Sequence, residues 1–112
     1  MGSCLRRGNE TEGTMERRGY VYIMTNGPSG TLYIGVTADL LHRIDQHRRG
    51  VGSAFCREHR LTRLVHVETL DRIDDAIARE KALKKWKRGW KLNLIGQHNP
   101  DWRDLWDDIV IP

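Results

Sequence analysis

The segment Tyr20-Val21-Tyr22-Ile23 decides the fold, together with the segment Tyr33-Ile34-Gly35, whose tyrosine follows Tyr22 by eleven residues. The run between them, Thr25-Asn26-Gly27-Pro28-Ser29-Gly30, is typical of a turn. Two apolar segments joined by a turn of this composition predict a β-hairpin.

The register of this hairpin is expected to place two tyrosines together. If the apolar residues are matched across the strands, Val21 falls opposite Ile34, and Tyr22 falls directly opposite Tyr33. The two tyrosines then share the face that the apolar residues do not use. Two phenols on one face are either a packing pair or a catalytic surface, and the hairpin alone leaves both interpretations open.

A helix is predicted after the hairpin. Thr37 or Asp39 supplies a suitable N-cap, and Gly50 supplies a C-terminal stop. At the helical repeat of about 100° per residue, one stripe carries apolar and polar side chains together: Leu40, Arg43, Ile44 and His47.

Arg43 on this stripe has two interpretations. A cation that is buried without a partner is costly, so Arg43 on a buried stripe needs a partner or a function. Alternatively, its long stem carries the guanidinium past the stripe to solvent. His47 follows one helical turn later on the same face.

The middle of the chain predicts one loop and one strand. Residues 51–60 have a mixed composition and are expected to form a loop or a short irregular turn, whereas residues 61–68 are expected to form a strand. His59 is interpreted as a surface histidine and His66 as a sheet-face histidine, because neither has partners at metal-ligand spacing. Strand alternation assigns Val65 and Val67 to one face, and Leu64 and His66 to the other.

A second helix is predicted from about Asp71 through Trp86. Glu80 lies in the middle of its apolar stripe. This carboxylate either forms a salt bridge with Arg43 or a lysine, or acts as a metal ligand or acid–base group in a partly dry site.

The end of this helix is strongly basic. Residues 79–91 contain seven Lys and Arg residues, interleaved with Trp86 and Trp90. Such a run is usually a solvated face, but the mixture also suits a surface that binds a phosphate backbone. The elements expected beyond it are a helix break at Gly89, a short apolar turn over residues 92–95 and a docking helix over residues 101–109.

Length and charge restrict the class of protein. The 112 residues are expected to form a disordered tail, 1–18, and a single domain, 19–112. The net charge of +4 favours anionic partners, with nucleic acid ahead of an acidic membrane. No apolar run reaches the ~18 residues of a membrane span, and the N-terminus lacks a signal-peptide pattern, so a cytoplasmic location is expected. Cys4 and Cys56 are expected to be reduced thiols.

In this order and spacing, the residues resemble the GIY-YIG endonuclease superfamily, especially its small standalone members. The resemblance runs from about Gly19 to Leu105. Tyr20-Val21-Tyr22 is similar to the first motif, with Tyr in place of its glycine and Val in place of its isoleucine, and Tyr33-Ile34-Gly35 matches the second letter for letter. The remaining matches are Arg43, ten residues after Tyr33, His47, four residues later, and Glu80 in Ala78-Arg79-Glu80-Lys81.

The resemblance implies a fold and a chemistry. The fold is of the α/β (α+β) class, with a small three-stranded antiparallel sheet flanked by helices. The chemistry is hydrolysis of a nucleic-acid phosphodiester, with Glu80 holding Mg²⁺ or Mn²⁺. Arg43 would bind the scissile phosphate, and His47 would relay a proton or orient the nucleophile. Tyr22 and Tyr33 are both candidates for the general base.

The resemblance also implies a nucleic-acid surface. The family has an asparagine near the phosphate, which matches Asn99 or, as an alternative, Asn93. The basic residues expected to bind flanking phosphates are Lys84, Lys87, Arg88 and Lys91.

The resemblance therefore implies a divalent-metal-dependent endonuclease, with DNA favoured over RNA as the substrate and DNA repair or recombination as the setting. One alternative is a non-catalytic nucleic-acid-binding module that keeps the site residues as a polar core. Another is a nuclease subunit that is active only with a protein partner.

Overall fold

The computed structural model describes residues 17–110. The predicted tail and Cys4 lie outside this range, apart from the last two tail residues. Arg17 already contacts the domain, because its backbone carbonyl accepts a hydrogen bond of 2.9 Å from the backbone N–H of Ile73. The contacts of the domain therefore begin before the predicted boundary at Gly19. Cys56 is a buried free thiol.

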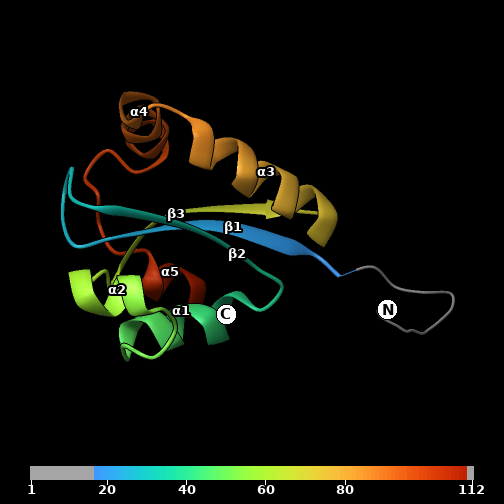
Figure 1. Ribbon diagram of the computed structural model, residues 1–112, viewed down its shortest axis with the longest axis horizontal. Helices are drawn as coiled ribbons and strands as arrows, with labels where there is room; N and C mark the ends of the chain where they lie inside the picture. The colour runs from blue at the N-terminus through green and yellow to red at the C-terminus, as the bar shows by residue number, and fades with distance from the viewer. Residues whose placement is uncertain (1–16, 111–112) are drawn as a thin grey trace, which may run out of the picture.

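Three antiparallel strands form the central layer, in the order β2-β1-β3. Helices α3 and α4 cover one face of this sheet, and α1, α2 and α5 cover the other (Figure 1). The predicted α+β class and three-stranded antiparallel sheet are confirmed. In chain order the elements are β1 Gly19–Thr25, β2 Leu32–Thr37, α1 Leu40–Arg48, α2 Ala54–His59, β3 Arg63–Leu70, α3 Ile73–Lys85, α4 Arg88–His98 and α5 Trp106–Val110.

The β1–β2 hairpin has a register two residues away from the predicted one. Tyr22 pairs with Gly35 rather than with Tyr33. The loop between the strands explains the difference. It is closed by its own hydrogen bonds, and it is longer than the loop that pairing Val21 with Ile34 would leave. Within it, the N–H of Gly30 donates to the carbonyl of Gly27 at 2.9 Å.

The shift in register leaves the faces unchanged, because side chains alternate with a period of two. Tyr22 and Tyr33 share one face of the sheet, as predicted. They are diagonal neighbours instead of a direct pair, and their ring centroids lie 6.3 Å apart.

A β-bulge in β3 makes the predicted faces of that strand wrong. Ile23 pairs with His66 and Met24 pairs with Leu64, so Val65 is an extra residue in the ladder. Leu64 and Val67 consequently pack on the face of Tyr22, whereas Val65 packs on the opposite face. Simple alternation fails here because a bulge places two residues opposite one.

Two hydrophobic clusters attach the helices to the sheet. The central strand β1 contributes to both, since its side chains alternate between the faces. The cluster beneath α3 and α4 contains Val21, Ile23, Ile34, Val65, Ala76, Leu83, Ile95 and Trp102. The cluster beneath α1, α2 and α5 contains Tyr22, Met24, Ile44, Cys56, Leu61 and Leu64.

Several predicted helix boundaries are wrong. Residues 51–60 contain the helix α2 instead of a continuous loop, and the helix break lies at Trp86, where the backbone is extended, instead of at Gly89. The predicted apolar turn, 92–95, lies inside α4.

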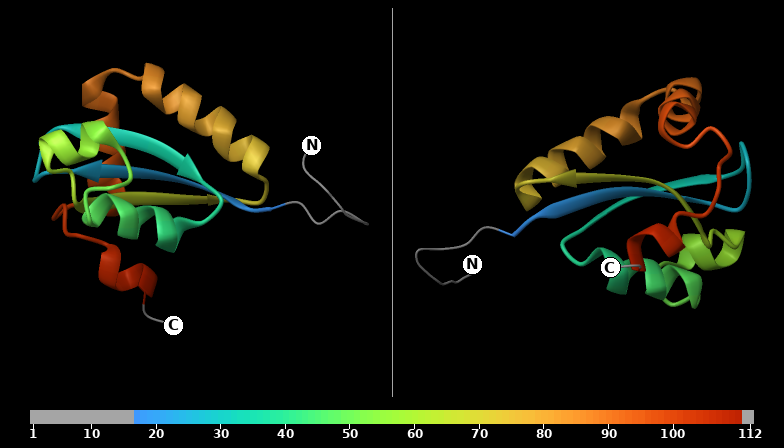
Figure 2. Two further views of the ribbon diagram at one scale, coloured as in Figure 1. Left: turned by 60° about the horizontal axis from the view of Figure 1, so that its bottom comes forward. Right: turned by 180° about the vertical axis from the view of Figure 1, so that it is seen from behind.

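The C-terminal segment also differs from its prediction. The backbone of Trp102 has a φ of +53°, so a helix cannot run through it, and α5 begins only at Trp106. This short helix packs beside α1 (Figure 2). None of the helices within residues 17–110 is long and apolar enough to cross a membrane.

Candidate active site

A buried tyrosine–histidine pair lies between β1 and α1. The hydroxyl of Tyr22 and Nε2 of His47 are 2.8 Å apart, and the two residues are 0% and 2% exposed. Helix α1 is fixed at its start by Asp39, whose side chain accepts a hydrogen bond from the backbone N–H of His42. This cap starts the helix, and the burial of Ile44 and His47 gives the face that α1 turns toward the sheet.

Gly35 explains how the ring of Tyr22 fits against β2. A Cβ atom at Gly35 would collide with Cζ and the hydroxyl oxygen of Tyr22. The ring therefore lies across the strand at the position where a side chain is missing. The glycine of Tyr33-Ile34-Gly35 is thus required by this close approach, and not by an unusual backbone angle.

Both members of the Tyr22–His47 pair favour their neutral forms. Burial raises the pKa of Tyr22, and the neighbouring phenol of Tyr33 raises it further, while the guanidinium of Arg43 opposes both. Burial lowers the pKa of His47, and the positive charge of Arg43 adds to this effect. The pair is therefore a phenol bonded to a neutral imidazole near pH 7.

Nδ1, the second ring nitrogen of His47, is buried and has no hydrogen-bond partner within residues 17–110. Gly52 packs so close to it that a Cβ atom there would lie 2.9 Å from Nδ1.

Arg43 lies half-buried on α1, one turn before His47. Its guanidinium is close enough to Tyr22 and His47 to change the pKa of both. No carboxylate in residues 17–110 forms an ion pair with it. Its remaining donors are available for an anion, and a guanidinium fork fits a phosphate well.

Tyr33 connects the pair to a groove at the β2 edge of the sheet. Its ring centroid is 5.5 Å from that of His47 and 6.2 Å from that of Phe55 on α2. The groove has a volume of about 330 Å³. The side chains that line it are Leu32, Tyr33, Ile34, Phe55, Lys84 and Lys91.

Phe55 was missed by the sequence analysis, which expected a loop here. A signal was present, because Ser53 caps the helix by accepting a hydrogen bond from the backbone N–H of Cys56. Serine two residues before Phe55 is a common N-cap, and it could have indicated the helix.

Glu80 lies on α3, which covers the opposite face of the sheet from Tyr22 and His47. Its carboxylate forms an ion pair of 2.7 Å with the ammonium of Lys84, and its side chain is 13% exposed. Lys84 lines the groove and Glu80 does not, so the ion pair with Lys84 is the contact that links Glu80 to the groove. The salt bridge to a lysine is one of the two interpretations expected for Glu80, and the partner is not Arg43.

The surroundings of Glu80 are compatible with a single hard cation. Residues 17–110 contain no cluster of three or more metal-ligating side chains. Mg²⁺ commonly binds through one or two carboxylates, with waters and substrate phosphates as the other ligands. The ammonium of Lys84 already occupies a cation position at Oε2 of Glu80, so a metal ion at this carboxylate would replace Lys84.

The residues expected to bind nucleic acid divide into two groups. Lys84 and Lys91 line the groove, and Lys87 is exposed at the start of α4. Arg88 instead donates to the carbonyls of Ser29 and Gly30 at 2.6 and 2.8 Å, and so ties α4 to the hairpin turn.

The two candidate asparagines lie away from the groove. Asn99 is buried, and its amide donates to the carbonyl of Val65 and accepts from the backbone N–H of Arg103. These bonds hold the C-terminal segment to β3. Asn93 is exposed on α4 and lines a separate pocket with Trp86 and Trp90.

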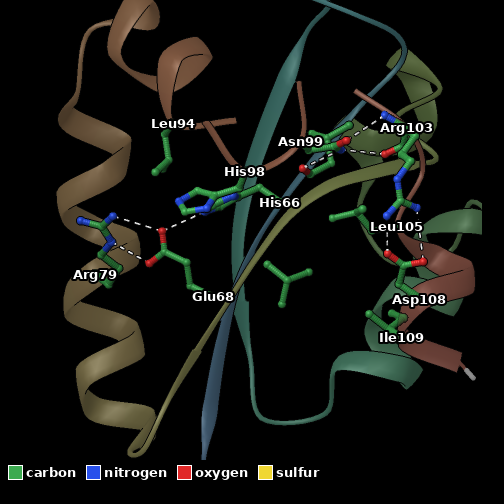
Figure 3. A pocket seen from close by; sticks show the side chains of 12 residues that line it. His66, Glu68, Arg79, Leu94, His98, Asn99, Arg103, Leu105, Asp108 and Ile109 are labelled. Carbon is green, nitrogen blue, oxygen red and sulfur yellow. Dashed lines mark hydrogen bonds and ion pairs between the residues drawn. The ribbon is translucent and has the colours of Figure 1, made fainter. Parts of the chain in front are cut away.

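A larger pocket of about 450 Å³ lies at the other edge of the sheet, along β3. Figure 3 shows that its charged side chains bind one another. Arg79 donates twice to Glu68, and Glu68 also contacts His66 at 2.8 Å. Burial acts to raise the pKa of Glu68, but the bonds from Arg79 and His66 outweigh it and lower that pKa. This internal pairing indicates a structural network connecting β3 to α3.

Comparison with known proteins identifies the class of domain. A family model described as the GIY-YIG catalytic domain matches residues 18–93. A UPF0213 protein of Syntrophus aciditrophicus (strain SB) is 36% identical over 85 residues, which cover 75% of this chain and 95% of that protein. A UPF0213 protein of Staphylococcus saprophyticus is 35% identical over 78 residues, covering 70% of this chain and 94% of that protein. No solved structure matches the chain.

The matched range begins just before β1 and ends within α4, so it contains every residue of the candidate site. A domain of this class is a nuclease domain. The chain belongs to the GIY-YIG family.

Proposed function

We propose that the chain is a divalent-metal-dependent endonuclease that hydrolyses phosphodiester bonds, with DNA as its substrate. The observation that carries the proposal is the Tyr22–His47 hydrogen bond beside Arg43, a guanidinium with no carboxylate partner in residues 17–110. A role in DNA repair or recombination and a cytoplasmic location belong to the same proposal.

Arg43 positions the scissile phosphate. Its fork of donors binds two phosphate oxygens and stabilises the charge that develops during attack. Because this guanidinium also interacts with the hydroxyl of Tyr22, a phosphate held there lies beside that hydroxyl. This proximity favours Tyr22 over Tyr33 as the proton acceptor, and because Tyr22 is 0% exposed in the free protein, substrate binding has to open the site before a water reaches its hydroxyl.

Tyr22 and His47 move the proton together. As a water attacks the phosphorus, its proton passes to the hydroxyl oxygen of Tyr22, while the phenolic proton passes to Nε2 of His47. Both groups are neutral before the transfer, in agreement with the directions of their pKa shifts. The transfer leaves a positive charge on His47 that burial and Arg43 disfavour, so the anionic phosphate has to offset it. Glu80 would hold a metal ion, which would supply Lewis-acid stabilisation of the leaving oxygen.

A cleavage panel tests this function. Duplex, single-stranded, flap and branched DNA, together with RNA, are incubated with Mn²⁺ or with EDTA. We expect cleavage of at least one DNA substrate in Mn²⁺ and none in EDTA. Arg43→Lys keeps the charge but loses the fork, so it should reduce the rate about a hundredfold.

Arg49→Lys is the matched control for this panel. Arg49 directly follows the last residue of the same helix, is exposed and pairs with Asp45, so its replacement should leave the rate unchanged. Cleavage that persists in EDTA, or equal rates for Arg43→Lys and the parent protein, would contradict the proposal.

One observation favours a second candidate, a non-catalytic nucleic-acid-binding module. The ion pair with Lys84 neutralises Glu80 without any metal. In that case the panel shows salt-dependent DNA binding and no metal-dependent cleavage of any substrate. A nuclease subunit that needs a protein partner would cleave only after a cell extract is added.

A further inference from the structure

An exposed row of aromatic rings lies beside the candidate site. Phe55 is 42% exposed, although its ring is large and apolar. Its centroid is 6.2 Å from that of Tyr33, with an angle of 29° between the ring planes, and 4.4 Å from that of His59. The near-parallel rings of Tyr33 and Phe55 offer flat apolar surface to the groove.

The groove combines this surface with positive charge. Leu32 and Ile34 add aliphatic side chains from the edge strand. Lys91 adds an ammonium group from α4, and Lys84 adds one from α3 that is paired with Glu80. None of the six lining residues is acidic. A ligand with a flat apolar part and an anionic part matches this lining, and a nucleotide has both.

The groove also lies close to Arg43, which is proposed to hold the scissile phosphate. Tyr33 lines the groove, and its ring is 5.5 Å from that of His47. His47 lies one helical turn from Arg43 on α1. A nucleotide in the groove would therefore lie next to a phosphate held by Arg43.

We propose that the groove formed by Tyr33, Phe55, Lys84 and Lys91 is a binding subsite for an unpaired nucleobase adjacent to the scissile phosphate. A base can present its face to Phe55 only if it is neither paired nor stacked inside a duplex. The substrate is therefore a single strand or a duplex with an unpaired nucleotide at the cut. This inference rests on the proposed nuclease function.

Trp90 provides an internal comparison. It is 56% exposed and lies in the basic segment, residues 79–91, that also contains Lys84 and Lys91. Its pocket, which Trp86, Asn93, Leu94 and Gln97 complete, contains no charged side chain. Trp90 contacts Trp86 and not the tyrosines. Phe55 and Trp90 are therefore both exposed, but only Phe55 lies beside a tyrosine and two lysines.

Binding of labelled single-stranded DNA oligonucleotides in EDTA tests the subsite without requiring turnover. Phe55→Leu should weaken binding about ten- to a hundredfold, which is the range for one base stacked on one aromatic ring. Phe55→Trp should restore the affinity, and Trp90→Leu should bind like the parent protein. Circular dichroism confirms that each variant is folded.

An abasic nucleotide moved along the oligonucleotide identifies the stacked base. At one position, the abasic substitution should weaken binding to the parent protein and should not further weaken binding to Phe55→Leu. Unchanged affinity for Phe55→Leu, or equal losses for both proteins at every position, would overturn the subsite. Absence of cleavage with an intact abasic effect would instead contradict only the proposed nuclease function.

Discussion

At the scale of single residues, the central feature is the hydrogen bond between the neutral side chains of Tyr22 and His47. Tyr22→Phe removes the hydroxyl and leaves Nε2 of His47 without its partner. We expect the cleavage rate to fall about a hundredfold or more, and the free energy of unfolding to fall by about 1 kcal/mol. Single-turnover cleavage and urea unfolding measure these two effects.

Tyr20→Phe is the control, because Tyr20 lies two residues earlier on the same strand. It should keep the rate of the parent protein. Tyr33→Phe should reduce the rate less than Tyr22→Phe does. A larger loss for Tyr33→Phe would assign the proton to Tyr33 and contradict the role given to Tyr22.

His47 predicts a pH dependence of stability. Its pKa is lowered by burial and by Arg43, so the unfolded chain takes up the proton first as the pH falls. The contribution of His47 to stability is complete above about 6.5, the ordinary histidine pKa, and decreases as the pH falls below it. Each unit of pKa difference corresponds to about 1.4 kcal/mol.

Urea unfolding between pH 5 and pH 7.5, spanning about one unit on either side of the ordinary histidine pKa, measures this effect. His47→Gln should lose less stability on acidification than the parent protein. His66 contributes in the same direction, because burial lowers its pKa despite its bond to Glu68. His47→Gln should therefore retain part of the dependence of stability on pH. Identical slopes for both proteins would show that His47 does not titrate differently in the folded state.

Much of the residue-level pattern could be predicted from the sequence. The tyrosines, Arg43 and His47 were found by their periodicity, and the structure places them on one face of the sheet. The partner of Glu80 was left open, because a helical wheel cannot choose between Lys84 and Arg43. Asn99 could not be placed, since its contacts depend on how the C-terminal segment folds back onto β3.

At the scale of secondary-structure elements, Gly35 controls the fit between β1 and β2. Gly35→Ala inserts a methyl group into the ring of Tyr22. We expect the free energy of unfolding to fall by about 1–3 kcal/mol, as for other overpacked sites, and the cleavage rate to fall because Tyr22 moves away from His47. Urea unfolding and single-turnover cleavage measure both.

Gly27→Ala is the matched substitution in the same hairpin. A Cβ atom at Gly27 has no neighbour within 4 Å, so this variant should behave like the parent protein. Equal stability of the two alanine variants would show that the close packing at Gly35 is relieved at no cost.

The order of most elements could be predicted from the sequence, but several boundaries could not. The β3 bulge arises from tertiary pairing with β1, so local alternation assigned Val67 to the wrong face. Helix α2 is too short to show a clear apolar stripe, and the sequence analysis treated Gly89 as a helix breaker although it lies within α4.

At the scale of the whole molecule, the net charge of +4 predicts salt-dependent DNA binding. Each phosphate contact contributes about −0.7 to −0.9 to the slope of log K against log salt. Lys87→Gln and Lys91→Gln should each reduce the magnitude of this slope by about one. Fluorescence anisotropy over a range of salt concentrations measures the slope.

Arg103→Gln is the control for this titration. Arg103 lies at the β3 edge of the molecule and is paired with Asp108, so it should leave the slope unchanged. A change in slope for Arg103→Gln and none for the lysine variants would place the DNA on the β3 edge and contradict the proposed surface.

The most direct test of the proposed nuclease compares two isosteric amide variants on one helix. Glu80→Gln removes the carboxylate proposed to hold the metal, whereas Asp75→Asn changes an exposed carboxylate in the first turn of α3. The measurement is single-turnover cleavage of the best DNA substrate in Mn²⁺, with affinity determined in EDTA. We predict that Glu80→Gln loses at least about a hundredfold in rate while binding DNA, and that Asp75→Asn cleaves like the parent protein. Cleavage by Glu80→Gln at the rate of the parent protein would contradict the proposed metal-dependent nuclease site.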